Sequence, residues 1–150
     1  MENLHQYFMQ EAINEAQKGL DEQGIPIGSV LVLDQKIIGR GHNQRIQKNS
    51  TTLHGEMDAL ENAGRLTPEI YQKSILYTTL SPCPMCTGAI LLYKIPHVVI
   101  GEHQNFMGEE ALLQQKGVKV TVLNDAQCIQ LMKDFIQKNP KIWFEDISEV

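Results

Sequence analysis

The sequence contains few cysteines and no long apolar run, and each absence excludes a class of protein. Three cysteines among 150 residues are too few for the disulfide framework of a secreted domain. No stretch approaches the roughly 20 apolar residues that a membrane-spanning helix needs, and the N-terminus lacks the basic start and apolar run of a signal peptide. We therefore expect no membrane contact and a cytoplasmic location, where thiols stay reduced.

Positive charge is also in short supply, because 13 Lys and Arg stand against 18 Asp and Glu, which gives a net charge of -5. An acidic chain repels phosphate backbones, so we expect no binding to long nucleic acid and a small-molecule substrate instead. Linkers, repeats and low-complexity segments are absent as well. With 42% hydrophobic and 21% charged residues, the composition fits a single globular domain over residues 1–150.

The spacing of apolar residues predicts the order of helices and strands. Leu4, Phe8, Ala12 and Ala16 recur at every fourth position, which predicts an amphipathic helix that ends near Gly19. Similar reasoning predicts helices over residues 53–62, 84–93 and 126–137, with a short tail after Pro140. Apolar runs predict a hairpin from strands at 27–33 and 36–38, and further strands at 74–78, 97–100 and 118–123.

After the hairpin, helices and strands alternate along the chain. This alternation favours an α/β fold in which helices cover both faces of a mostly parallel sheet. Ligands of such sheets bind at the carboxyl ends of the strands. The strand at 74–78 leads directly into Pro82 and Cys83, so we expect the cysteines to lie at that edge.

Two short motifs carry the chemistry, His54-Gly55-Glu56 and Pro82-Cys83-Pro84-Met85-Cys86. Together they spell H-x-E followed by P-C-x-x-C, the signature of zinc-dependent nucleobase deaminases. His54, Cys83 and Cys86 are therefore the candidate metal ligands, and they predict one Zn²⁺ per chain. Three protein ligands leave the fourth position of a tetrahedral zinc to water, which then yields hydroxide near neutral pH.

The helix positions of these residues suit the metal. Cys83 and Cys86 are three apart at the start of a helix, so both sulfurs face one side, and the helix N-terminus favours their thiolate forms. Pro84 suits the first helical turn. On a helix, residues two apart point roughly 200° apart. We therefore expect His54 at an irregular helix start and Glu56, the candidate general acid and base, inside the helix.

A structural zinc is the alternative interpretation of the same residues. It needs a fourth protein ligand, and Cys128 is the remaining cysteine. Because Cys128 lies within an apolar stretch of the last predicted helix, it is better interpreted as a small buried side chain.

The sequence also resembles the fungal-type cytosine deaminases of the cytidine deaminase-like superfamily over nearly its whole length. The resemblance lies in residues 39–43, 52–56, 76–83, 86–90 and 143–147. It implies a three-layer α/β/α sandwich with a five-stranded mixed sheet, and a homodimer. It departs at Pro84, where that family has an acidic residue and adenosine and guanine deaminases commonly have proline, and within residues 103–107.

The resemblance further implies a role for individual residues in binding a nucleobase. Asn43 and the Gly55 N–H would contact the polar edge of the ring, and the Ser81 carbonyl and the Asp146 carboxylate would face its amino group. The ring itself would be enclosed by three apolar side chains, which are Phe106, Trp143 and Ile27. The segment around Trp143 would act as a lid.

These observations predict hydrolytic, zinc-dependent deamination of free cytosine to uracil and ammonia, a reaction of pyrimidine salvage. Deamination of guanine, isoguanine or a related purine by the same zinc chemistry is an alternative. Deamination of adenosine in tRNA is another, although it requires a positive surface that an acidic chain disfavours. A zinc-stabilised interaction domain without activity is the non-enzymatic alternative.

Overall fold

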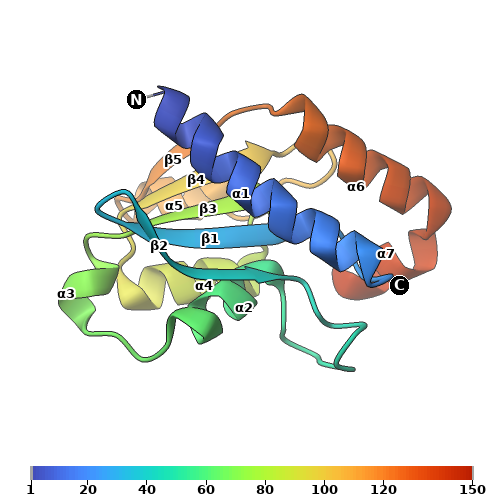
Figure 1. The fold of residues 1–150 in the computed structure, drawn as a ribbon, viewed down its shortest axis with the longest axis horizontal. Helices are drawn as coiled ribbons and strands as arrows, with labels where there is room; N and C mark the ends of the chain where they lie inside the picture. The colour runs from blue at the N-terminus through green and yellow to red at the C-terminus, as the bar shows by residue number, and fades with distance from the viewer. Residues whose placement is uncertain (1, 150) are drawn as a thin grey trace.

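The computed structural model describes residues 2–149, with the side chains of residues 4–149. The elements are α1 (Glu2–Asp21), β1 (Gly28–Leu33), β2 (Lys36–His42), α2 (Gly55–Ala63), α3 (Pro68–Tyr71), β3 (Ile75–Leu80), α4 (Pro84–Tyr93), β4 (His97–Glu102), α5 (Glu110–Gln115), β5 (Lys119–Val122), α6 (Ala126–Lys138) and α7 (Pro140–Asp146). Over this range, helices and strands alternate along the chain from β3 to α6, whereas β1 and β2 follow one another, as do α2 and α3 and also α6 and α7 (Figure 1).

The five strands form one mixed sheet in the order β2-β1-β3-β4-β5. β1 is antiparallel to both β2 and β3, whereas β3, β4 and β5 are parallel. The β1–β2 hairpin turns at Asp34 and Gln35, which both have positive φ, as a two-residue hairpin turn of the favoured twist requires. This arrangement brings the start of β1 and the ends of β2 and β3 to the same edge of the sheet.

Successive residues of each strand pack on opposite faces of the sheet, which gives the molecule three layers. On one face, Val30, Tyr77 and Val99 pack against Phe8 and Met9 of α1. On the other face, Leu31, Leu76, Val98 and Ile100 of the strands pack against α2, α4 and α5, with Ile90 of α4 and Leu113 of α5 in the same cluster. Figure 1 shows α1 and α6 on one side of the sheet and α2 and α4 on the other. The α/β fold with a five-stranded mixed sheet is confirmed.

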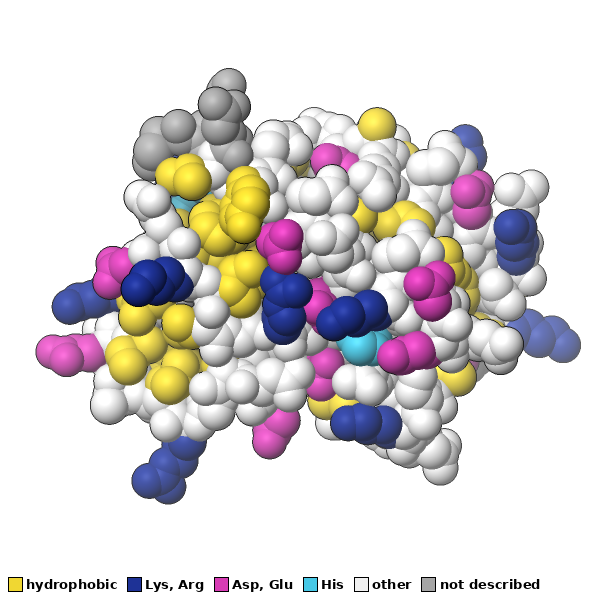
Figure 2. Space-filling view, viewed as in Figure 1, with side chains coloured by type: hydrophobic (Ala, Val, Ile, Leu, Met, Phe, Trp, Pro, Cys, Tyr) yellow, Lys and Arg dark blue, Asp and Glu magenta, His cyan; other side chains and the backbone are white. Residues whose placement is uncertain are grey.

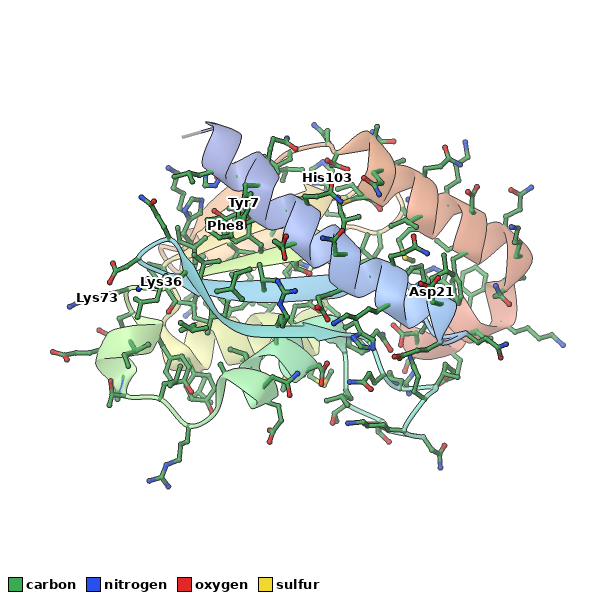
Figure 3. All side chains as sticks on the ribbon, viewed as in Figure 1. Tyr7, Phe8, Asp21, Lys36, Lys73 and His103 are labelled. Carbon is green, nitrogen blue, oxygen red and sulfur yellow. The ribbon has the colours of Figure 1, made fainter. Side chains whose placement is uncertain are left out.

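Helix α1 follows the predicted amphipathic pattern. Phe8, Ala12 and Ala16 are buried, whereas Tyr7 is largely exposed on the same turn as Phe8. Figure 3 shows Tyr7 and Phe8 on the first half of α1 and Asp21 at its end. Of the helices in the part of the chain that the structure describes, neither α1 nor any other is long and apolar enough to cross a membrane.

The spacing of apolar residues did not predict three short helices, and some helix and strand boundaries differ from the predicted ones. α3, α5 and α7 span four to seven residues, too short for a 3.6-residue period to show. The tail predicted after Pro140 was therefore wrong, since Pro140 is the first residue of a helix rather than the end of one. β2 continues to His42, well beyond the predicted residue 38, because Gly39 and Gly41 weaken the apolar signal.

A histidine at the start of β4 makes stability depend on pH. His97 lies against Thr121, with Nε2 2.9 Å from Oγ1, and its ring contacts the His5 ring edge-on. Burial, together with the positive charges of Lys119 and His5, lowers the pKa of His97 to about 4. Between about pH 6.5 and 4, the His97 side chain is therefore protonated in the unfolded chain but neutral in the folded chain. The folded state loses stability as the pH falls through this range.

We expect His97→Gln to reduce this pH dependence. The glutamine amide can still reach Thr121 but cannot titrate. Between pH 7.5 and 5, the melting temperature of the wild type should fall further than that of His97→Gln, because only the wild type carries a titratable group at this position. An equal loss in both proteins would show that His97 does not cause it.

Candidate active site

Two helix N-termini meet at the edge of the sheet where β3 ends. His54 precedes the first residue of α2 and Cys83 precedes the first residue of α4, and both have extended backbone conformations. The predicted irregular helix start at His54 is thus confirmed, and Glu56 lies inside α2. Cys86 lies in the first turn of α4, and its N–H donates to Cys83 Sγ at 3.5 Å.

The three candidate metal ligands lie in one compact group. His54 Nδ1 is 3.4 Å from Cys83 Sγ and 3.7 Å from Cys86 Sγ, and the ligand atoms all lie within 4.8 Å of one another. Zinc bonds of about 2.3 Å to sulfur and 2.0 Å to nitrogen, in tetrahedral geometry, place such atoms roughly 3.5 Å apart. The donor set and its spacing therefore fit Zn²⁺.

The charges of this group favour metal binding. Burial lowers the pKa of His54, but hydrogen bonds to Asp146 and Cys83 outweigh it and raise the pKa to about 10. Hydrogen bonds from Cys86 and His54 lower the pKa of the Cys83 thiol to about 4, although burial opposes this. The group thus favours a thiolate beside an imidazolium. A cation can displace that proton and bind the same atoms, so metal binding releases a proton.

Cys128 does not belong to this group. Its side chain is buried in the apolar cluster under α1, with Phe8 and Val99, and burial raises the pKa of its thiol. Among residues 4–149, the group of potential ligands around His54 contains only three members. The interpretation of Cys128 as a small buried side chain is confirmed.

Glu56 is a buried carboxyl next to the ligand group. Its side chain is 4% exposed, and burial raises its pKa to about 7, despite the opposing charge of His54. A carboxyl whose pKa lies near neutral pH can both accept and donate a proton under working conditions.

Asp146 connects α7 to the ligand group. Its Oδ2 lies 3.5 Å from His54 Nε2, the ring nitrogen opposite the one that faces the cysteines. A carboxylate in this position fixes the orientation and tautomer of a metal-binding histidine. Asp146 Oδ1 accepts hydrogen bonds from Asn43 Nδ2 and Arg45 Nη1, both at 3.2 Å. Although burial raises the pKa of Asp146, its hydrogen bonds to His54 and Asn43 hold that pKa below its usual value.

Arg45 holds α7 against the loop that follows β2. Its Nη2 donates to Glu145 at 2.8 Å and its Nε donates to the Thr51 carbonyl at 2.8 Å. Its backbone N–H donates to Asn43 Oδ1 at 3.0 Å, which fixes the orientation of that amide. The contact with Glu145 joins residues that lie 100 positions apart in the sequence.

A narrow cavity opens onto the ligand group. Its volume is about 20 Å³, which leaves room for little more than one water molecule. Its walls are formed by Ile27, His54, Glu56, Leu80, Ser81, Cys83, Phe106, Trp143, Asp146 and Ile147. The Phe106 and Trp143 rings meet edge-on, 6.0 Å apart between centroids. A ring-sized molecule can enter only if one of these walls moves.

The structure places most of the predicted site residues around this cavity, with three exceptions. Asn43, Gly55 and Cys86 are buried but do not line the cavity, and Asn43 donates a hydrogen bond to Asp146. Gly55 has a packing reason to be glycine, because a Cβ there would lie 3.0 Å from the Ile27 carbonyl oxygen. The role of each of these residues in binding stays a prediction.

Sequence reasoning missed three residues of the site. Leu80 and Ile147 line the cavity, and Arg45 holds two acidic residues of α7. Leu80 could have been found, since it continues the strand that leads to Pro82. Arg45 carries no local signal, because an arginine in a loop is usually solvated.

Comparisons with known proteins agree with this geometry. Residues 2–102 match the family described as the cytidine and deoxycytidylate deaminase zinc-binding region. The chain is 56% identical over 142 residues to a cytosine deaminase of Candida albicans, covering 94% of this chain and 95% of that protein. It is 41% identical over 147 residues to a tRNA-specific adenosine deaminase of Streptococcus pyogenes, covering 88% of this chain and 89% of that protein.

A solved structure has a fold similar to that of this chain. A protein from a study of tRNA:A34 deaminases superposes with a TM-score of 0.72 at 28% identity, covering 84% of this chain and 99% of the other. The matched region contains both motifs, and their histidine and cysteines form the group described above. The chain therefore belongs to the cytidine and deoxycytidylate deaminase family of zinc-binding proteins.

Proposed function

We propose that this protein is a zinc-dependent hydrolase that converts free cytosine to uracil and ammonia, with residues 1–150 forming one deaminase domain. The observation that carries the proposal is a buried carboxyl, Glu56, beside three metal ligands at the bottom of a narrow cavity. The relative from Candida albicans, a cytosine deaminase, matches nearly the whole chain.

His54, Cys83 and Cys86 would hold the zinc ion. When bound there, zinc supplies a Lewis acid that makes hydroxide available near neutral pH. Cys83 and Cys86 favour zinc over harder cations because both are thiolate donors. Asp146 would hold the His54 ring with Nδ1 directed at the metal.

Glu56 would carry the protons of the reaction. As a buried carboxyl beside the ligand group, it would take a proton from water as the ring carbon is attacked and donate it to the ring nitrogen. Glu56 would then take the proton of the hydroxyl group now attached to the ring carbon and pass it to the amino group. The C–N bond breaks as the ring C=O bond forms, and ammonia leaves. Burial keeps these transfers away from bulk water.

The remaining residues would bind and orient the base. The Asn43 amide and the Gly55 N–H would recognise its polar edge, while the Ser81 carbonyl and Asp146 would face the amino group. Phe106 and Trp143 would cover the ring, and Ile27 would contact its side.

Helix α7 would act as a lid over the bound ring. The cavity is too small for a ring, and α7 supplies Trp143, Asp146 and the adjoining Ile147 to its wall. Arg45 would hold the closed position through Glu145 and Asp146. Opening of α7 would admit cytosine and release uracil.

An acidic chain with mixed surface charge supports a free base over a polynucleotide. Figure 2 shows the face of the molecule seen in Figure 1. On the described residues of this face, Lys and Arg are interspersed with Asp and Glu, without a continuous basic area. A tRNA substrate would require such an area for its phosphates.

The test is ammonia release by the purified zinc protein from cytosine, cytidine, guanine, isoguanine and adenine. Turnover of cytosine without cytidine supports the proposal, because a ribose would not fit under Trp143. Turnover of a purine instead would keep the zinc chemistry and refute the assigned substrate. Zinc binding without any turnover would favour the structural-zinc alternative.

We also propose that the protein is a cytoplasmic homodimer that pairs through α2 and α4. Leu92 and Tyr93 of α4 are 69% and 42% exposed. They adjoin a groove of about 290 Å³ between α2 and α4, to which Met57 and Ala89 contribute. The groove is also lined by the charged residues Glu61 and Arg65. Exposed apolar side chains beside a groove of mixed polarity are typical of a surface that a second copy covers.

Leu92→Glu is expected to convert the dimer to a monomer. The new charge would be buried without a partner at the interface. Tyr7→Glu is the matched control, because Tyr7 is an exposed apolar residue of α1 on the opposite side of the sheet. Analytical ultracentrifugation measures both. A wild-type monomer, or an unchanged mass for Leu92→Glu, would contradict this interface.

A further inference from the structure

Two buried carboxylates hold the loop that carries Phe106. The first is Glu102 at the end of β4, which is fully buried. Its Oε2 accepts hydrogen bonds from the backbone N–H groups of Gln104 and Asn105, at 2.8 and 3.0 Å, and its Oε1 accepts one from Asn105 Nδ2 at 2.9 Å. These bonds fix the start of the loop.

The second carboxylate, Glu110, connects the end of the loop to the residue before Pro82. The Ser81 hydroxyl donates to Glu110 Oε2 at 2.6 Å, and Ser81 Oγ accepts from the Gly108 N–H at 2.9 Å. His103 Nδ1 lies 3.0 and 3.1 Å from the two oxygens of Glu110, so the ring N–H donates to the carboxylate. His103 is labelled in Figure 3.

The two segments also touch through their backbones. The Glu109 N–H donates to the Pro82 carbonyl at 3.3 Å. A Cβ at Gly108 would lie 1.8 Å from the same oxygen, so only glycine permits the approach. Hydrogen bonds therefore join Glu110 and the loop that carries Phe106 to Ser81 and Pro82.

Neither Glu110 nor His103 lines the cavity, whereas Ser81 and Phe106 both do. A charge-assisted hydrogen bond of this length in a buried position is strong and directional. This hydrogen bond connects two segments that line the cavity, because the Ser81 hydroxyl that it binds also accepts from the N–H of Gly108 in the loop that carries Phe106.

We propose that Glu110, supported by His103, is a positioning residue for substrate binding, which rests on the proposed function. It sets the distance between the Ser81 carbonyl and the Phe106 ring, and thereby the slot that a planar base enters. Both walls contact the base before and during reaction and transfer no proton. Their displacement weakens ground-state and transition-state binding alike, so KM rises while kcat changes little.

The test compares Glu110→Ala, Glu110→Gln and Ser81→Ala with the wild type. Steady-state kinetics with cytosine give KM and kcat, and inhibition by uracil gives an independent binding constant. We expect Glu110→Ala to raise both KM and the uracil constant about tenfold, as the loss of a hydrogen bond to a charged group does. Glu110→Gln should stay near the wild type, because its amide oxygen still accepts from Ser81.

Glu109→Gln is the matched control, because Glu109 is the preceding residue and its side chain makes no hydrogen bond to the described residues. It should leave both constants unchanged. Ser81→Ala should reproduce the Glu110→Ala effect, and the double variant should add nothing further if both act through one bond. Ser81→Ala removes a single oxygen. If Glu110→Ala fails to fold, Ser81→Ala therefore still tests whether this hydrogen bond affects substrate binding.

The results separate this proposal from the proposed function. A wild type that releases no ammonia from cytosine would overturn the function. A wild type that turns over cytosine, with an unchanged uracil constant in Glu110→Ala and Ser81→Ala, would overturn the positioning role alone. A parallel loss of zinc would likewise overturn it, since the effect would then arise at Cys83.

Discussion

Glu56→Gln is expected to lower kcat by about 10²- to 10⁴-fold, the usual contribution of a general acid and base. Glutamine fills the same buried space, but it cannot accept a proton from water and return it to the ring. Zinc content should stay at the wild-type level, because Glu56 is not among the three ligands. Turnover and zinc content are measured on the same preparation.

The control for this variant is Glu61→Gln on the same helix. Glu61 is exposed and lies two turns from the ligand group, so its replacement should change neither kcat nor zinc content. A Glu56→Gln protein that retains zinc and turns over at the wild-type rate would show that the proton carrier is another group.

Cys86→Ser is expected to abolish stable zinc binding. The serine hydroxyl stays protonated at neutral pH and is a poor ligand for zinc compared with a thiolate, so two ligands remain for a site that needs three. The loss of affinity should exceed about 100-fold, the upper end of what loss of an outer-shell partner costs. Because bound metal stabilises the folded state, the melting temperature should fall together with turnover.

Cys128→Ala provides the matched control for this experiment. Cys128 is equally buried but packs in the cluster under α1, away from the ligand group. The variant should keep one zinc per chain and its activity, even if packing loss lowers its stability. Zinc loss from Cys128→Ala, or full zinc in Cys86→Ser, would contradict the proposed ligand set.

Much of the fold could be predicted from local patterns. The strands that face both layers have long apolar runs, and α4 begins at Pro84 and ends at Tyr93 as the pattern indicates. The irregular start of α2 at His54 could also be predicted, because His54 and Glu56 cannot serve one site from the same regular turn, although the helix begins at Gly55 rather than at the predicted residue 53. In each case the prediction depends on a requirement that neighbouring residues meet by themselves, such as burial of a strand or the geometry of one helical turn.

The remainder depends on contacts between distant parts of the chain. Pro140 ends a helical pattern in one context and begins a helix in another, and only packing of Trp143 against the site decides which. The ties from Arg45 to Glu145 and from Ser81 to Glu110 join loops to helices far along the chain. The spacing of apolar residues along the sequence does not predict such pairs of distant polar residues.

The central claim is that one zinc ion at His54, Cys83 and Cys86 enables deamination of free cytosine. The most direct measurement is uracil formation from cytosine by protein stripped of metal and then titrated with Zn²⁺. Activity should rise in proportion to bound zinc and stop rising at one ion per chain. Turnover by the stripped protein, or a fully loaded protein that forms no uracil, would contradict the account.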